Sequence, residues 1–436
     1  MQENLRQTVS ETRRGWFADP MMAAVHALGI TQITAWGTSY YCLGVLADPI
    51  AASMSWSRSF VFLGFTVALI VMALVSTTVG RVIDMRGARV VMAFGTALVS
   101  VALLALAFVT DRNAYLAVWA FLGLGMRCCL YDAAFAALVQ VTPTRGRTAI
   151  SYLTLYGAFA SSIFWTIGHY LNQWVGWRQT LMVFAAVNLA VCLPLNWFGL
   201  ARREDAQPVA VSAPEATISP EGPVLEGRMR TVGVILFALI MSLNGFVFGV
   251  ISQQLVFLLE ASGLAAAAAV WIASLKGVAQ FGGRLIEIVF GRNLKAITVA
   301  RIAIGVLPAS LALLLAAAGN FAAILAFTLL MGASQGVITI VRGAVPLALF
   351  GAKGYGTVLG VIATPILIVG AAAPTVFALM VDGLGWHTSL IVLLVCATLS
   401  WIAIELMSRW YAAAQRRVTA GSAACLAARH WSLDTT

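Results

Sequence analysis

The chain has 436 residues and a formal net charge of +10, and 61% of its residues are hydrophobic while only 10% are charged. Soluble globular chains carry about 25% charged residues, so this composition excludes a water-soluble protein. The basic residues stand singly or in short groups between apolar stretches, which argues against a nucleic-acid-binding surface. We therefore expect a membrane protein with no nucleic-acid partner.

The first half of the chain is predicted to cross the membrane six times. Residues 1–22 lack an apolar run followed by a cleavage site, so we expect no signal peptide and a cytoplasmic N-terminal segment. The apolar runs that follow are each roughly 20 residues long, enough to cross the ~30 Å hydrocarbon core of a bilayer. They make up the predicted half 23–200 and lie near 24–47, 59–80, 88–110, 114–139, 148–170 and 178–199.

The second half is predicted to repeat this pattern after a linker. Residues 201–230 contain four prolines, several small residues and a charged group, a composition that cannot bury enough apolar area to fold alone. We expect a flexible cytoplasmic linker there, a six-helix half at 231–408 and a cytoplasmic tail at 409–436. The apolar runs of this half lie near 232–258, 265–289, 296–318, 320–341, 355–380 and 388–408.

The positions of the basic residues predict the orientation of these twelve helices. With the N-terminus inside, nearly all of the 27 Lys and Arg residues fall on the cytoplasmic side. The exceptions are Arg58, Arg112 and Arg178 outside, and Arg127 and Lys276 within the membrane. This bias predicts a multi-pass protein of the bacterial inner membrane with both termini in the cytoplasm.

The six cysteines are mostly placed inside apolar runs. They show no extracellular-type spacing, so we interpret them as small hydrophobic residues rather than as a disulfide framework. The six are Cys42, Cys128, Cys129, Cys192, Cys396 and Cys425.

A short glycine-rich and basic loop follows the second predicted helix. Its sequence is Gly80-Arg81-Val-Ile-Asp84-Met-Arg86-Gly87-Ala-Arg89. Glycines allow two helix ends to approach, the acid suits the N-terminus of a neighbouring helix, and the arginines tether the loop to the cytoplasmic face. A second copy, Gly283-Arg284-Leu-Ile-Glu287, follows the eighth helix. The repeat indicates a parallel duplication of six helices.

This loop resembles the signature loop of the major facilitator superfamily, because Gly80, Asp84, Gly87 and Arg89 meet its pattern. The resemblance covers almost the whole chain. It implies an all-α membrane fold of two six-helix halves related by a pseudo-twofold axis. It also implies that Asp84, with Arg81 or Arg86, latches the halves on the cytoplasmic side when the cavity faces outward. The second copy departs from the pattern at Glu287.

The charged residue Arg127 lies deep inside the fourth predicted helix. A charge at the centre of a membrane helix costs roughly 2.5 to 3.5 kcal/mol, so it faces a cavity or a partner. Its planar fork can grip a carboxylate at two points, and Tyr131, one turn further on, lies on the same face. We expect both to bind substrate; alternatively, Arg127 is held by carbonyls or a neighbouring acid and only braces the bundle.

Two further charged residues, Lys276 and Asp132, are predicted to lie within the membrane. Lys276, in the eighth helix, is expected to bring a second cation towards the midplane, which favours an anionic substrate; otherwise it reaches the outer surface. Asp132 is expected to be rotated off the face of Arg127. It is either the proton carrier of a coupled transporter or a permanent counter-ion of Arg127.

Uncharged polar residues on the first and seventh helices are candidates for lining the cavity. We expect Gln32, Trp36 and Asn244 to do so, although hydrogen bonding between helices uses the same residue types. Arg342 is expected to emerge on the cytoplasmic side, where it would contact a headgroup or a gate. The adjacent Cys128 and Cys129 point to different faces of a helix, which weakens a metalloid-binding interpretation.

No catalytic pattern in the sequence suits an enzyme. Gly332-Ala-Ser334-Gln-Gly336 matches a nucleophile pattern but lies inside a membrane helix, where small residues serve helix packing. We therefore predict a secondary active transporter without cofactors or metals, functional as a monomer in the lipid bilayer. It would move a small organic solute, an anion such as a carboxylate, coupled to protons. The alternatives are a drug or metalloid efflux pump and a non-transporting membrane sensor.

Overall fold

The computed structural model describes residues 19–202, 218–219 and 222–433. Residues 1–18 of the predicted cytoplasmic segment 1–22 and most of the predicted linker 201–230 lie outside these ranges. Within the linker, the two-residue strands β1 (Ile218–Ser219) and β2 (Gly222–Pro223) pair antiparallel. Everything else with regular structure in the described part is helical.

The N-terminal half consists of six membrane-crossing passes, several of which are broken. The first pass begins where Asp19 caps the backbone N–H of Met21 and Pro20 occupies the first helical position. Arg145 donates two hydrogen bonds to Asp19, which lowers the pKa of that carboxyl group and ties the start of the first pass to the loop before the fifth. The elements are α2 (Pro20–Ala35), η1 (Trp36–Tyr40), α3 (Leu43–Met54), α4 (Arg58–Arg86), α5 (Ala88–Phe108), α6 (Arg112–Cys129), α7 (Tyr131–Val141), α8 (Gly146–Gly157), α9 (Ala160–Val187), η2 (Asn188–Cys192) and α10 (Leu193–Phe198).

The C-terminal half is built from longer helices. Its elements are α11 (Gly227–Ala261), α12 (Ala266–Phe290), η3 (Gly291–Asn293), α13 (Ala296–Leu315), α14 (Phe321–Phe350) and α15 (Tyr355–Leu433). Eight helices of the described chain are long and apolar enough to cross a membrane. Two of these, Gly146–Phe198 and Tyr355–Arg416, each contain two helices joined at a glycine with positive φ, Gly176 and Gly385.

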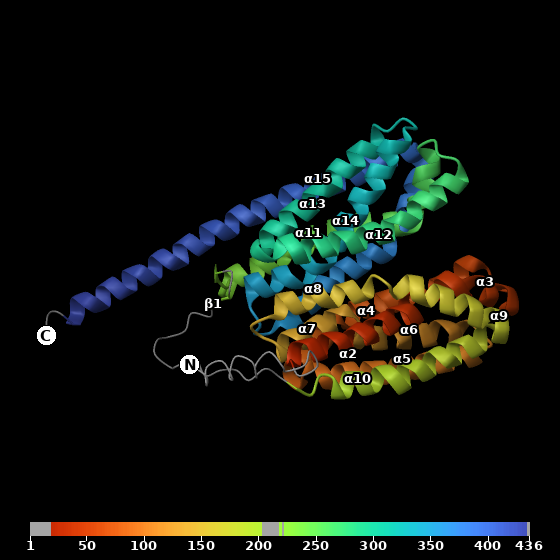
Figure 1. Cartoon of the computed structure of the whole chain (residues 1–436), viewed down its shortest axis with the longest axis horizontal. Coiled ribbons are helices and arrows are strands. Elements are labelled where there is room, and N and C mark those ends of the chain that lie inside the picture. Colours follow the sequence, from red (N-terminus) through yellow and green to blue (C-terminus); the bar gives the residue numbers. More distant parts are fainter. Residues whose placement is uncertain (1–18, 203–217, 220–221, 434–436) are drawn as a thin grey trace, which may run out of the picture.

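Together with the broken first pass and α12, these helices are consistent with the twelve predicted spans. The predicted all-α membrane fold of two six-helix halves is confirmed. Figure 1 shows the two halves meeting at the end near β1 and diverging towards the end that carries α3 and α9. We call the end near β1 the basic end, because most of the Lys and Arg residues are predicted from the sequence to lie there. The residues of this end that the site uses are Asp84, Arg147, Glu287 and Thr357.

The seam between α4 and α15 joins the halves and is made of small residues. A Cβ atom on Gly80 would overlap the backbone of Gly356, and one on Gly360 would overlap the backbone of Ser76. Thr364 donates a hydrogen bond from its hydroxyl to the carbonyl oxygen of Ala73 at 3.2 Å. Close backbone approach at small residues is the usual way in which membrane helices pack, because lipid gives no hydrophobic drive to associate.

Two predicted helix ends are wrong. The tenth pass, α14, continues past 341 to Phe350, because Pro346 lies inside the helix without ending it. The twelfth pass does not end at 408: α15 continues to Leu433, and Figure 1 shows it projecting beyond the bundle. The predicted tail 409–436 is rich in alanine and contains no proline, which favours continuation of the helix.

Glycine packing predicts a stability difference between two single-methyl substitutions. A Cβ on Gly123 in α6 would overlap the backbone of Ala68 in α4, whereas a Cβ on Gly277 in α12 meets nothing within 4 Å. We expect Gly123→Ala to destabilise the protein by about 1 to 3 kcal/mol through overpacking. Gly277→Ala serves as the matched control and should be neutral or stabilising. Thermal melting in detergent measures both, and equal melting temperatures would contradict this account of the packing.

Candidate functional site

The fourth pass is broken at Leu130, and this break builds the site. Leu130 has φ −82° and ψ −170°, an extended conformation between the end of α6 and the start of α7. The break frees the carbonyl oxygen of Cys129, which accepts a hydrogen bond from Nε2 of Gln32 at 2.8 Å. Trp36 in turn donates from Nε1 to Oε1 of Gln32 at 3.2 Å. The fully buried amide of Gln32 therefore braces the break instead of lining an open cavity.

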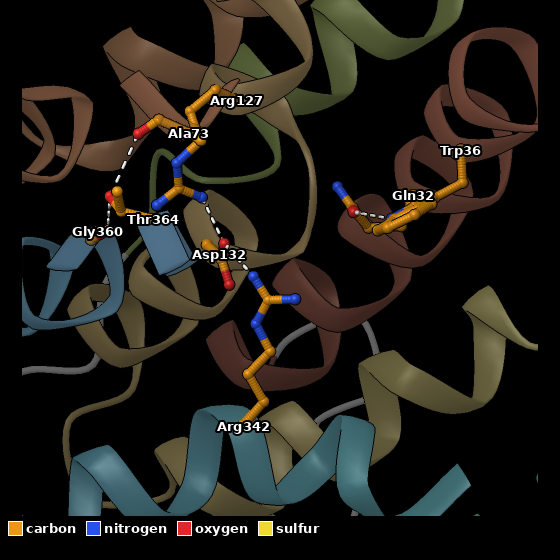
Figure 2. Close-up of polar contacts among 8 residues, drawn as sticks. All are labelled: Gln32, Trp36, Ala73, Arg127, Asp132, Arg342, Gly360 and Thr364. Atoms are coloured by element: carbon orange, nitrogen blue, oxygen red, sulfur yellow. Dashed lines mark hydrogen bonds and ion pairs between the residues drawn. The ribbon is translucent and has the colours of Figure 1, made fainter. Parts of the chain in front are cut away.

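Asp132 stands just past the break and binds two arginines, one from each half. Its Oδ2 accepts from Nη1 of Arg127 at 2.5 Å and from Nη2 of Arg342 at 2.7 Å, as Figure 2 shows. The side chains of Arg127, Asp132 and Arg342 are 3%, 6% and 24% exposed. We call these three residues the ion triad. Since Asp132 lies in the first turn of α7, the helix dipole also favours its negative charge.

The expectation that Asp132 is rotated away from Arg127 is wrong. It assumed a continuous helix through 114–139, and the extended Leu130 resets the register between the two residues. Tyr131, expected on the same face as Arg127, instead packs its ring against Trp36 with centroids 5.1 Å apart and stacks on Phe135 at 5.2 Å.

The expectation that Arg342 emerges from the membrane helix is also corrected by the structure. Arg342 lies eight residues before the end of α14 at Phe350, and Asp132 lies nine residues before the end of α7 at Val141. The tenth pass is the repeat equivalent of the fourth, so the two residues occupy nearly matching positions in the two halves. The duplication was a signal that could have identified this pair.

The ion triad holds one positive charge in excess and leaves polar atoms unsatisfied. Two guanidinium groups share a single carboxylate. Nε of Arg127 and Oδ1 of Asp132 are buried without a hydrogen-bond partner in the described part of the chain. Unpaired buried polar atoms are costly, so these atoms are available to a ligand or to a rearranged pairing.

The other predicted site residues in the C-terminal half lie apart from these contacts. Lys276 is half-buried and contacts Oγ of Ser252 at 3.4 Å, with its ammonium group 5.6 Å from the ring centroid of Phe248. Asn244 is buried, and its Nδ2 has no partner among the described residues. The second cation next to Arg127 is therefore Arg342 and not Lys276.

The adjacent cysteines of the fourth pass do not belong to a larger group of metal-binding side chains in the described ranges. Cys128 and Cys129 are buried, and their sulfur atoms are free. No group of three or more His, Cys, Asp or Glu residues that could hold a metal ion occurs in the part of the chain that the structure describes.

Both copies of the repeated motif were expected to be loops, but the first forms the last turns of α4 up to Arg86 and the second lies within α12. The first copy contacts the other half at the basic end. Asp84 accepts hydrogen bonds from the backbone N–H groups of Gly356 at 2.9 Å and Thr357 at 2.7 Å, and from the Thr357 hydroxyl at 2.6 Å. Its carboxylate thus caps the N-terminus of α15 from outside that helix. Gly87 has φ 84°, a conformation that favours glycine, and ends α4.

The arginines of this first loop do not latch the halves. Arg81 and Arg86 are exposed and have no side-chain partner among the described residues. Arg89 places its guanidinium carbon 4.4 Å from the ring centroid of Trp197, within the N-terminal half.

The second copy makes the reciprocal contact with α8. Arg284 donates from Nη1 to the carbonyl oxygen of Thr154 at 2.5 Å, and Glu287 pairs with Arg147 at 3.4 Å. Gly283 allows α12 to approach the backbone of Ala333 in α14. Both copies of the motif therefore join the halves at the basic end, and the ion triad joins them deeper inside the bundle.

The comparisons with known proteins agree with this geometry. The sequence matches the family described as the Major Facilitator Superfamily over residues 28–311, which is more than half of the chain. Among curated proteins, the Multidrug resistance protein MdtL of Citrobacter koseri is 27% identical over 180 residues, covering 41% of this chain and 45% of that protein. The chain thus aligns with less than half the length of this relative.

Several solved structures share the fold. The human organic anion transporter MFSD10 (TETRAN) has a TM-score of 0.69 at 15% identity, covering 88% of this chain and 99% of that one. FucP in the outward conformation has a TM-score of 0.66 at 14% identity, covering 90% and 99% of the two chains. The proton:xylose symporter XylE, bound to 6-bromo-6-deoxy-D-glucose, has a TM-score of 0.66 at 10% identity, covering 88% and 95%.

Removal of the charge on Arg342 should loosen the basic end. In Arg342→Gln the Arg127–Asp132 pair remains, but the ion pair between the halves is lost. The equilibrium between the state with the halves joined at the basic end and the state with them apart should therefore shift about tenfold towards the latter. Spin labels on the exposed residues Met85 and Lys353 report the separation by double electron–electron resonance.

The matched control for this measurement is Arg228→Gln, which removes an exposed charge at the same end. Its distance distribution should equal that of the unsubstituted protein. The same distribution in Arg342→Gln would mean that the ion triad does not hold the halves together.

Proposed function

Because this chain belongs to the major facilitator superfamily, we propose that it is a secondary active transporter for a small organic anion such as a carboxylate. Transport would follow alternating access and be coupled to protons. The observation that carries this proposal is the ion triad, in which one carboxylate is shared between cations of the two halves.

The charge balance of the ion triad supports an anionic substrate. Two guanidinium groups against one carboxylate leave an excess positive charge inside the bundle, and Nε of Arg127 has no hydrogen-bond partner among the described residues. A substrate carboxylate can accept from a guanidinium fork at two points, which makes such hydrogen bonds both strong and directional. A cationic substrate would instead be repelled.

The distribution of contacts supports a state that is closed on the cytoplasmic side. The positive-inside rule assigns the basic end to the cytoplasm. Asp84 with Thr357, Arg284 with Thr154 and Arg147 with Glu287 join the halves at that end. Rocking of the halves to the opposite state would break these contacts together with the Asp132–Arg342 pair.

This rocking supplies a route for proton coupling. In the closed state, the carboxylate of Asp132 accepts hydrogen bonds from two guanidinium groups. When the halves separate at the basic end, Arg342 would withdraw with the C-terminal half, and a proton could take its place at Oδ2 of Asp132. A proton taken up in one state and released in the other would couple transport to the pH gradient.

A drug efflux pump is the second candidate. One observation favours it: the curated relative from Citrobacter koseri carries the name of a multidrug resistance protein. The excess positive charge at the ion triad favours the anion carrier over a pump for cationic drugs.

The anion proposal predicts the effect of substitutions at Arg127. Arg127→Ala should abolish uptake of carboxylates into proteoliposomes, and Arg127→Lys should weaken it, because lysine offers a point charge in place of a planar fork. Arg112→Ala removes a charge from the exposed start of the same helix and should transport normally. Unchanged transport kinetics in Arg127→Ala would exclude this residue from the substrate site.

The coupling proposal predicts a separation of exchange from accumulation. In Asp132→Asn no carboxylate remains to carry a proton, so substrate exchange across the membrane should persist while accumulation driven by a pH gradient is lost. Radiolabelled substrate in proteoliposomes with and without an imposed gradient measures both. Intact accumulation in this variant would rule out Asp132 as the proton carrier.

A further inference from the structure

Six aromatic side chains form a continuous cluster in the N-terminal half, beside the ion triad. Trp36 lies 4.7 Å from Tyr40 and 5.1 Å from Tyr131, and Tyr40 lies 4.8 Å from Phe65, measured between ring centroids. We call the whole set the aromatic cluster. It comprises Trp36, Tyr40, Tyr41, Phe65, Tyr131 and Trp165.

The backbone of the first pass is altered at this cluster. Residues 36–40 form the π-helical turn η1, whose wider winding interrupts the regular helix and is frequently found at functional sites. Consecutive residues of a regular helix point about 100° apart. Here the adjacent Tyr40 and Tyr41 nevertheless contact each other with ring centroids 5.2 Å apart, and both lie near Trp36.

The aromatic cluster is not part of the closed core. Trp36, Tyr40, Tyr41 and Tyr131 are half-buried, in contrast to the fully buried Trp119. The hydroxyl of Tyr131 is buried without a hydrogen-bond partner in the described part of the chain. The cluster therefore presents ring faces together with at least one polar atom that a ligand could satisfy.

The aromatic cluster adjoins the ion triad through the chain itself, because Tyr131 directly precedes Asp132. Asp132 in turn accepts hydrogen bonds from Arg127 and Arg342. The cluster therefore lies next to two guanidinium groups that share one carboxylate. Aromatic cages also bind cations, but here the neighbouring guanidinium groups would repel a cationic ligand. The combination suits a flat ring that carries a negative group.

We propose that the aromatic cluster binds the ring of an aromatic carboxylate and that this compound class is the substrate. The ring would lie among Trp36, Tyr40 and Tyr131, with its carboxylate directed towards the arginines of the ion triad. This inference rests on the proposed function as an anion carrier and narrows it. The Tyr131 hydroxyl would gain a partner in the bound state.

A matched pair of probes tests the inference on the unsubstituted protein. Benzoate and cyclohexanecarboxylate carry the same charge and have similar size, but only benzoate has a π face. Contacts with two rings should make benzoate bind on the order of tenfold more tightly in a calorimetric titration of the purified protein. Equal affinities would overturn the aromatic inference and leave the anion carrier standing. Binding of benzyltrimethylammonium with no binding of either carboxylate would overturn both.

Substitutions locate the ring site. Trp36→Leu should reduce the preference for benzoate to roughly equal binding of the two probes, and Trp36→Phe should retain most of it. Trp174→Leu is the matched control, because this tryptophan is 78% exposed and lies outside the cluster; its preference should be unchanged. A full benzoate preference in folded Trp36→Leu would overturn the assignment. The probe comparison decides the question even if that variant does not fold.

Discussion

The shared carboxylate of Asp132 is the interaction on which the arrangement of the two halves depends. A buried guanidinium without a counter-charge is strongly unfavourable, and removal of one partner from such a pair typically costs about 3 to 5 kcal/mol. Arg127 and Arg342 face one another inside an apolar bundle only because Asp132 lies between them. One carboxylate oxygen thus provides both the counter-charge of the N-terminal half and the link to the C-terminal half.

The local structure around this carboxylate follows from the break in the fourth pass. An unbroken helix would have turned Asp132 away from Arg127. The extended Leu130 prevents this, and the carbonyl oxygen of Cys129 that the break frees is satisfied by Gln32. A residue of the first pass whose hydrogen bonds go to a backbone carbonyl and to Trp36 therefore supports the charge pairing. The π-helical turn follows directly at Trp36, which donates to the same glutamine.

Much of the architecture could be predicted from the sequence, because a bilayer imposes a simple length requirement. Runs of roughly 20 apolar residues and the repeated loop at Gly80 and Gly283 were sufficient for two six-helix halves. Contacts within the site were harder to predict, because helical periodicity assumes regular geometry. Under that assumption, Asp132 was predicted to lie on a different helix face from Arg127. The tenth pass was also predicted to end before Arg342. Neither Leu130 nor Pro346 indicates by residue type alone whether a helix breaks or continues.

The seam between α4 and α15 has a consequence for the kinetics of any motion between the halves. Where Gly80 meets Gly356 and Gly360 meets Ser76, backbone lies against backbone. At such contacts two helices can slide past one another without first separating interdigitated side chains. The activation barrier would then be set by a small number of directional bonds, such as those of Asp84 and Asp132. A bundle joined in this way can be firmly closed at rest and still reopen quickly, a combination that a large interdigitated interface would prevent.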